Sequence, residues 1–216
     1  MAALTAGRGP ARILTVNTGS SSLKVRLVGE GDLVLADHQV AAPEGRFDEE
    51  DLAAAVGSLE GVDATGFRVV HGGESFTGPV ALDGEVERRL ASLASLAPLH
   101  QGAALEAIRA CRRLLPGVPA VACFDTAFHA TLPAAAREYA VPPEWRRLGV
   151  RRFGFHGLSH RYAAGRAAQM LGRRWLRCVT CHLGSGASLA AVRDGRSVDT
   201  TMGFTPLDGL VMATRS

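Results

Sequence analysis

A polar turn between two apolar segments gathers the kinds of side chain that bind a phosphate group. Ile13–Val16 is rich in β-branched residues and predicts a buried strand, and the alternating residues 23–27 predict a second strand. The turn 17–22 offers a glycine that lets the backbone approach a ligand, together with hydroxyl and N–H donors. Lys24 is the only lysine among 24 basic residues, which favours a compact point charge here. The order of a Walker loop is missing, and a serine-rich hairpin with a surface lysine explains the same residues.

Three further predicted strands also end in polar or glycine-rich residues. Phe67–His71 stops at two glycines, Pro119–Phe124 is followed by Asp125, and Arg177–Leu183 leads into the stretch 182–186. In open α/β sheets, ligands bind at such strand ends. One polar strand end carries little information, but four of them predict a shared cleft.

The remaining pattern alternates helices with strands. Helices are predicted at 47–59, 84–96, 102–115 and 157–171, with a short one in the proline-punctuated segment 133–149. Additional strands are predicted at 32–40, 188–192 and 197–201, the first of which completes an antiparallel meander. Asp194-Gly195 is typical of a hairpin turn with positive φ. The chain is therefore predicted to be a mixed α/β protein, with residues 1–11 as a disordered extension.

Composition and charge exclude several classes of function. The net charge of +3 is small and the basic residues are scattered, so no nucleic-acid partner is predicted. No apolar run approaches the length of a membrane span, so no membrane partner is predicted either. The N-terminal residues lack the apolar core of a secretory signal, which predicts a cytoplasmic protein.

Two of the four cysteines lie three residues apart, directly before a histidine. The sequence from Cys178 to His182, CVTCH, matches the pattern of c-type haem attachment. It lies within the apolar run 176–183, which predicts a buried strand, and two cysteines three apart on a strand point to opposite faces. We therefore interpret Cys178 and Cys181 as small hydrophobic residues of the core.

Six dispersed motifs resemble those of the acetokinase family, in the family's order and spacing. They are VNTGSSSLKVRL at 16–27, RVVHGGE at 68–74, APLH at 97–100, FDTAFHATLP at 124–133, RRFGFHGLSHRY at 151–162 and the stretch 181–216. The resemblance runs from about Arg12 to the last residue and fades between Val28 and Gly66.

The resemblance implies a fold and a reaction. The fold is that of the sugar-kinase, Hsp70 and actin superfamily: actin-like, ribonuclease H-like α/β domains with mixed sheets and flanking helices, two of them around a cleft. This chain would contain the N-terminal domain, 12–130, and the truncated start of the nucleotide-binding domain, 131–216. The implied reaction is reversible transfer of the γ-phosphoryl group of ATP to acetate, with Mg²⁺ or Mn²⁺, giving acetyl phosphate and ADP. The resemblance also implies a homodimer for the full-length protein.

The resemblance assigns roles to four residues before position 101. Asn17 would lie beside the metal ion, and Lys24 near the ATP phosphates. Arg68 would hold the acetate carboxylate through a bidentate pair, and His100 would line the same site. An arginine on so apolar a strand favours a buried anionic partner over a position at a sheet edge.

Further roles fall on the later part of the chain. Asp125 would be the active-site carboxylate, although its place before Thr126 also suits a helix cap. His156 and Arg215 would stabilise the transferred phosphoryl group. His160, one turn after His156, suits either a metal pair or the packing of its helix, and packing is the better interpretation. The loop that would bind the ATP phosphates comprises His182, Leu183, Gly184, Ser185 and Gly186.

The implied chemistry agrees with this inventory. Acetate is already ionised at neutral pH, because carboxylic acids have pKa values of about 4, so no general base is needed. Phosphoryl transfer requires mainly alignment and positive charge around the equatorial oxygens. Asp125 is therefore interpreted as an organiser of metal or substrate, and the transfer as a direct, in-line one.

Length and a few substitutions leave alternatives open. The family's proteins are much longer, so the sequence predicts a fragment without the adenosine pocket, whose own activity is an open question. One alternative is a kinase of the same family that acts on propionate or butyrate. Another is a non-catalytic remnant. Leu158 stands where the family usually has threonine, which also leaves substrate preference open.

Overall fold

The computed structural model describes residues 11–19, 21–98, 100–174 and 176–213. The chain divides into two units: the first comprises residues 1–69 and 80–122, and the second comprises 70–79 and 123–216. Of the predicted disordered extension 1–11, only Ala11 belongs to the described residues. The predicted domain boundary between residues 130 and 131 stays a prediction.

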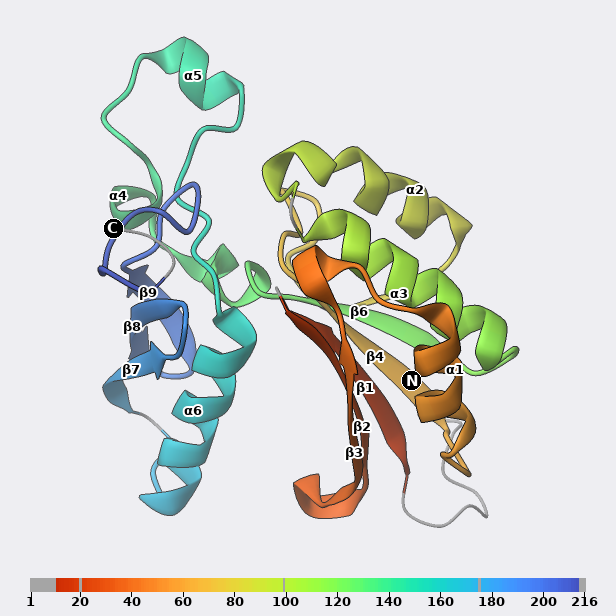
Figure 1. Ribbon diagram of the computed structural model, residues 1–216. Coiled ribbons are helices and arrows are strands. Elements are labelled where there is room, and N and C mark those ends of the chain that lie inside the picture. The colour runs from red at the N-terminus through yellow and green to blue at the C-terminus, as the bar shows by residue number, and fades with distance from the viewer. Residues whose placement is uncertain (1–10, 20, 99, 175, 214–216) are drawn as a thin grey trace. The chain divides into compact units, whose positions relative to one another are not determined.

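The first unit is built on a six-stranded mixed sheet (Figure 1). Its strands are β1 (Ile13–Thr18), β2 (Ser22–Val28), β3 (Val34–Ala41), β4 (Ala64–Val69), β5 (Val80–Ala81) and β6 (Ala120–Phe124), in the order β3-β2-β1-β4-β6-β5. The first three strands form the predicted antiparallel meander, whereas β1 and β4 pair in parallel. The third strand begins later than predicted because residues Glu30–Asp32 form a short 3-10 helix, η1, with positive φ at Gly31 and Asp32.

Three helices cover one face of this sheet (Figure 1). α1 (Glu49–Gly57) and α2 (Gly84–Ser92) each begin after an aspartate whose carboxylate accepts a backbone N–H of the first turn. α3 (Gln101–Leu114) lies against β1 and β4. Alternate residues of β1, among them Leu14 and Val16, are buried, and the residues between them are half-buried. Two further 3-10 turns, η2 (Pro43–Gly45) and η3 (Ala94–Leu96), complete the unit, and η3 takes the place of the predicted last turn of α2.

The second unit contains a three-stranded antiparallel sheet, β7 (Arg177–Leu183), β8 (Ala187–Arg193) and β9 (Arg196–Thr200), in that order. α6 (Gly157–Met170) packs on it through Ala164, which contacts Ala190 and Val192. The turn between β8 and β9 is Asp194-Gly195, with φ of 55° and 75°, as the sequence predicts. The unit also contains η4 (Ala127–Thr131) and two short helices, α4 (Ala134–Arg137) and α5 (Pro143–Arg147).

The prediction of a buried strand at 176–183 is wrong. Val179, Cys181 and Leu183 on one face of β7 are exposed, so Cys181 is not a core residue. Cys178 is half-buried and packs against the core cluster that contains Ala164. β7 is an edge strand of its sheet, and α6 covers only the face that carries Cys178 and Thr180. The cysteines do lie on opposite faces, as predicted.

Within the described ranges, no helix is long and apolar enough to cross a membrane.

Candidate functional site

Three of the predicted site residues form a row across the sheet of the first unit. The antiparallel register of β1 and β2 pairs Asn17 with Lys24, and the parallel register of β1 and β4 pairs Asn17 with Arg68. Residues paired across neighbouring strands carry their side chains on the same face, about 5 Å apart. The sheet therefore presents an amide between two cations near the C-terminal ends of two parallel strands, where ligands of α/β sheets bind.

A side-chain hydrogen bond fixes the centre of this row. Arg68 Nη1 donates to Asn17 Oδ1 over 3.1 Å. Arg68 is half-buried and lies on β4, a central strand, so the sheet-edge position weighed from the sequence is wrong, whereas the anionic partner stays a prediction. A guanidinium group has five N–H donors, enough to hold Asn17 and both oxygens of one carboxylate. His100, half-buried, is the residue that precedes α3.

In the second unit, a backbone hydrogen bond ties Asp125 to the start of α6. Asp125 follows β6 directly, is 2% exposed, and accepts the N–H of Gly157 on its backbone oxygen over 2.9 Å. His156, the residue before α6, has a left-handed backbone with φ 57° and ψ 20°. Such a conformation is uncommon for a residue with a Cβ and is typical of functional positions. The N-cap residue of η4 is Thr126, which makes no side-chain cap hydrogen bond, and the helix cap considered for Asp125 stays a prediction.

Three histidines and their hydroxyl partners form a polar cluster in the second unit. Ser188 Oγ lies 2.8 Å from both His156 Nδ1 and His160 Nε2, and His160 Nδ1 lies 2.8 Å from Thr180 Oγ1. The rings of His156 and His182 stack with centroids 4.0 Å apart. His182 Nδ1 in turn lies 2.9 Å from Ser159 Oγ. The cluster therefore connects α6 to both β7 and β8.

Burial keeps His160 neutral. Its pKa is lowered from 6.5 to about 4, first by burial and then by the neighbouring histidines 129, 156 and 182, against an opposing effect of Asp125. Both of its ring nitrogens have hydroxyl partners, so His160 is a packing residue of α6. Within the described residues, no group of three or more His, Cys, Asp or Glu side chains could hold a metal ion.

The predicted phosphate loop is the turn between β7 and β8. It is closed by a hydrogen bond from Gly184 N to Gly186 O of 3.0 Å. A Cβ atom on Gly186 would lie 3.2 Å from His156 Nε2, so the loop passes directly beside that ring. Leu183, Gly184 and Ser185 are exposed. Arg215, the last predicted site residue, lies outside the described residues.

Sequence reasoning missed Ser188 and Thr180. Both are polar residues at buried positions of alternating strands, with exposed fractions of 0% and 7%. A buried hydroxyl needs a hydrogen-bond partner, but the sequence alone does not show that histidines of another element face these two residues.

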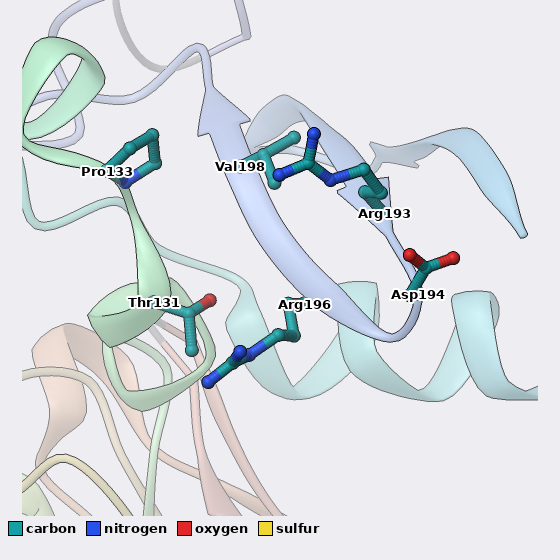
Figure 2. A pocket seen from close by; sticks show the side chains of 6 residues that line it. All are labelled: Thr131, Pro133, Arg193, Asp194, Arg196 and Val198. Atoms are coloured by element: carbon teal, nitrogen blue, oxygen red, sulfur yellow. The ribbon is translucent and has the colours of Figure 1, made fainter. Parts of the chain in front are cut away.

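A separate cavity of about 550 Å³ lies beside the β8–β9 turn (Figure 2). It is lined by Thr131, Pro133, Arg193, Asp194, Arg196 and Val198. Arg193 and Arg196 are register partners across the two strands. None of the predicted site residues is among these six, so the cavity does not bear on the predicted chemistry.

His71 provides a prediction about acid stability. It is 0% exposed, its Nδ1 accepts the N–H of Gly73 over 2.9 Å, and its ring packs edge-on against Phe153. Burial, and after it the charge of Arg151, lowers the pKa of His71 from 6.5 to about 4. The stability from the neutral ring is complete above pH 6.5, where the unfolded chain is also deprotonated. It is lost as the pH falls toward 4, because the unfolded chain takes up a proton first.

Between pH 6.5 and about 4, the free energy of unfolding should therefore fall by about 1.4 kcal/mol per pH unit for each buried histidine that is neutral in the folded chain. Urea unfolding at pH 7.5, 6.0 and 5.0 measures how steeply the free energy of unfolding depends on pH. His71→Gln cannot titrate, so in this variant about one proton fewer should be taken up on unfolding, and the dependence should be less steep. An unchanged slope in this variant would mean that His71 is not the titrating group.

The fold of this chain is similar to that of solved kinases. The mixed sheets with flanking helices belong to the actin-like α/β class. An acetate kinase from Porphyromonas gingivalis superposes with a TM-score of 0.85 at 36% identity, and the match covers 95% of this chain and 61% of that one. A propionate kinase from Francisella tularensis gives 0.83 at 37% identity, with coverages of 95% and 61%.

The particular family follows from the sequence comparisons. The acetokinase family model matches residues 32–216. An acetate kinase of Trichormus variabilis is 56% identical over 163 residues, which cover 74% of this chain and 40% of that protein. One from Caldanaerobacter subterraneus is 44% identical, with coverages of 95% and 60%. The chain belongs to the acetokinase family and spans 40% to 60% of the length of these relatives.

Proposed function

We propose that this chain carries the acyl- and phosphate-binding residues of an acetate kinase, which transfers the γ-phosphoryl group of ATP to acetate. The observation that carries this proposal is the row Lys24, Asn17, Arg68, held by the Arg68–Asn17 hydrogen bond, in a member of the acetokinase family. A small carboxylate needs a bidentate cation, and a polyphosphate needs a point charge and an oxygen ligand for its metal. The row supplies all three.

Each residue has a defined part in this proposal. Arg68 holds both carboxylate oxygens of acetate, with His100 beside it, and Lys24 binds ATP phosphates. His156 and Arg215 contact the equatorial oxygens of the transferred group, where negative charge must be held. The loop of His182, Leu183, Gly184, Ser185 and Gly186 binds the ATP phosphates, although the N–H of Gly184 already donates to the backbone oxygen of Gly186.

The donor set fits a magnesium ion that is held mainly by the substrate. Asn17 Oδ1 is a hard oxygen ligand, and an amide oxygen has two lone pairs, so it can accept from Arg68 and still bind a cation. Mg²⁺ usually keeps several waters and binds through one or two protein ligands plus substrate phosphates. When bound, the ion neutralises charge on the phosphates. Mn²⁺ accepts the same oxygen ligands.

The transfer itself moves one group between two oxygens. An acetate oxygen attacks the γ-phosphorus, the new O–P bond forms as the bond to the β-phosphate oxygen breaks, and ADP leaves with the electron pair. No proton is transferred, because acetate is already an anion. Asp125 therefore acts as an organiser of the site and not as a base.

Acetyl phosphate formation tests the proposal directly. The 216-residue chain with ATP, Mg²⁺ and acetate should give acetyl phosphate, trapped as the hydroxamate, and each added methylene of propionate or butyrate should lower kcat/KM roughly 10-fold or more. The propionate kinase among the similar structures makes propionate the second candidate, and a higher kcat/KM for propionate would favour it. Absence of product together with absence of MgATP binding by calorimetry would instead indicate a non-catalytic remnant.

The stereochemistry of the transfer is a further part of the proposal. A single in-line displacement inverts the configuration at phosphorus, so ATP with a chiral γ-phosphate should give acetyl phosphate of inverted configuration. Net retention would contradict direct transfer.

The homodimer that the resemblance implies for the full-length protein stays a prediction.

A further inference from the structure

A chain of three buried polar groups, Thr180, His160 and Ser188, leads from a backbone carbonyl to the ring of the half-buried His156. Thr180 Oγ1 donates to the backbone oxygen of Ala190 over 3.4 Å, and it lies 2.8 Å from His160 Nδ1. His160 Nε2 lies 2.8 Å from Ser188 Oγ, which lies 2.8 Å from His156 Nδ1. Every link connects a hydroxyl to a ring nitrogen or a carbonyl, so the direction of one hydrogen bond determines the direction of the next.

The carbonyl end sets this direction, because a carbonyl oxygen only accepts. Thr180 gives its hydroxyl proton to Ala190, so its oxygen accepts from His160 Nδ1–H. The other nitrogen of a neutral imidazole is an acceptor, so His160 Nε2 accepts the hydroxyl proton of Ser188. Ser188 Oγ is then left to accept, and the donor that faces it is His156 Nδ1–H.

The charge state of His160 agrees with this assignment. Protonation would place a hydrogen on both ring nitrogens and reverse the bond to Ser188. Burial lowers the pKa of His160 to about 4, so the ring is neutral at physiological pH even with Asp125 in its surroundings. His160 is 1% exposed and Ser188 0% exposed, so water does not compete for these bonds.

We propose that Ser188, His160 and Thr180 are positioning residues that hold His156 in the Nδ1–H tautomer. The lone pair of the neutral His156 ring is then on Nε2, the atom beside Gly186 in the phosphate loop. A proton taken up by His156 arrives at Nε2, so positive charge and a new N–H donor appear together at the atom nearest the loop. That this N–H donates to a phosphoryl oxygen rests on the proposed function. The tautomer of His156 does not depend on the proposed function.

Histidine ¹⁵N spectra test the tautomer independently of activity. At alkaline pH, His156 in the ¹⁵N-labelled chain, assigned with His156→Gln, should show a protonated Nδ1 and an unprotonated Nε2. In Ser188→Ala the Nδ1–H loses its acceptor, so the pattern should shift toward a protonated Nε2. A protonated Nε2 in the unmodified chain, or the same tautomer in Ser188→Ala, would overturn the inference.

Ser197→Ala is the matched control. Ser197 is also 0% exposed, and its Oγ lies 2.8 Å from Nδ1 of another buried histidine, His129. The same atoms are lost at the same depth in the same unit, so general destabilisation should be similar while the His156 signals stay in place. If Ser188→Ala does not fold, Thr180→Val removes the hydroxyl at the far end of the chain of bonds and should give His156 a mixture of tautomers. An unmixed Nδ1–H tautomer in Thr180→Val would contradict the inference.

Activity separates this inference from the proposed function. Ser188→Ala should lower kcat for acetyl phosphate formation on the order of 10- to 100-fold with little change in KM for acetate, because only the alignment of His156 changes. The predicted tautomer in a chain that makes no acetyl phosphate would support the positioning and refute the function. Acetyl phosphate formation by a chain with the opposite tautomer would do the reverse.

Discussion

Arg68→Ala is expected to lower kcat/KM for acetate by on the order of 100- to 1,000-fold in the acetyl phosphate assay. The substitution removes the bidentate partner of the carboxylate, and charged hydrogen-bonded pairs of this kind contribute roughly 2–5 kcal/mol when one partner is lost. It also removes the donor that holds Asn17 Oδ1, so the amide next to it becomes free to rotate. Arg68→Lys keeps the charge but lacks the planar pair of N–H donors, so it should recover only a small part of the activity.

Arg26→Ala is the matched control for this prediction. Arg26 lies two residues from Lys24 on the exposed face of β2, and its guanidinium pairs with Asp37 over 3.0 Å at the surface. Arg26→Ala removes one positive charge from the same sheet as Arg68→Ala does. A loss of kcat/KM caused by net charge alone would therefore appear in both variants. Equal kcat/KM values for Arg68→Ala and the unchanged chain would refute the assignment of Arg68 to the carboxylate.

Local patterns in the sequence predicted most of the helices, strands and turns of the fold. The polar turn after β1, the helix that starts at Gly157 and the Asp194-Gly195 hairpin were all predictable, because each depends on neighbours within a few residues. The row of Lys24, Asn17 and Arg68 was not predictable from local pattern. It depends on the parallel register of β1 and β4, which are separated by 45 residues between Thr18 and Ala64.

The errors have a related physical cause. An apolar strand appears buried in a sequence whether it is central or at an edge, and only the order of strands shows that β7 has one open face. The partners of His156 and His160 were missed because serine and threonine in a strand seem ordinary until a histidine from another element faces them. The residue types that can bind phosphate and carboxylate were therefore recognisable from the sequence, whereas the hydrogen-bond partners of these residues were not.

Gly157→Ala is expected to destabilise the folded chain by about 3 kcal/mol or more, the upper range for overpacking of a buried site. A Cβ atom at this position would meet the backbone oxygen of Asp125 below contact distance and Phe128 Cβ at 2.8 Å. The backbone on one side cannot move without breaking the 2.9 Å bond from Gly157 N to Asp125 O. Because this bond joins the end of β6 to the start of α6, its loss should also displace His156 from Ser188. Urea unfolding measures the first effect and the ¹⁵N signals of His156 the second.

Gly165→Ala shows what the same substitution does elsewhere on the same helix. A Cβ at Gly165 would have nothing within 4 Å, and the residue is exposed. Alanine in an open helical position stabilises by roughly 0.5–1 kcal/mol relative to glycine, so the two variants should shift stability in opposite directions. A small effect of Gly157→Ala, comparable in size with that of Gly165→Ala, would mean that the junction of Asp125 and α6 can relax. His156 would then not be held by the tight contact between these two segments, and its left-handed backbone would need another cause.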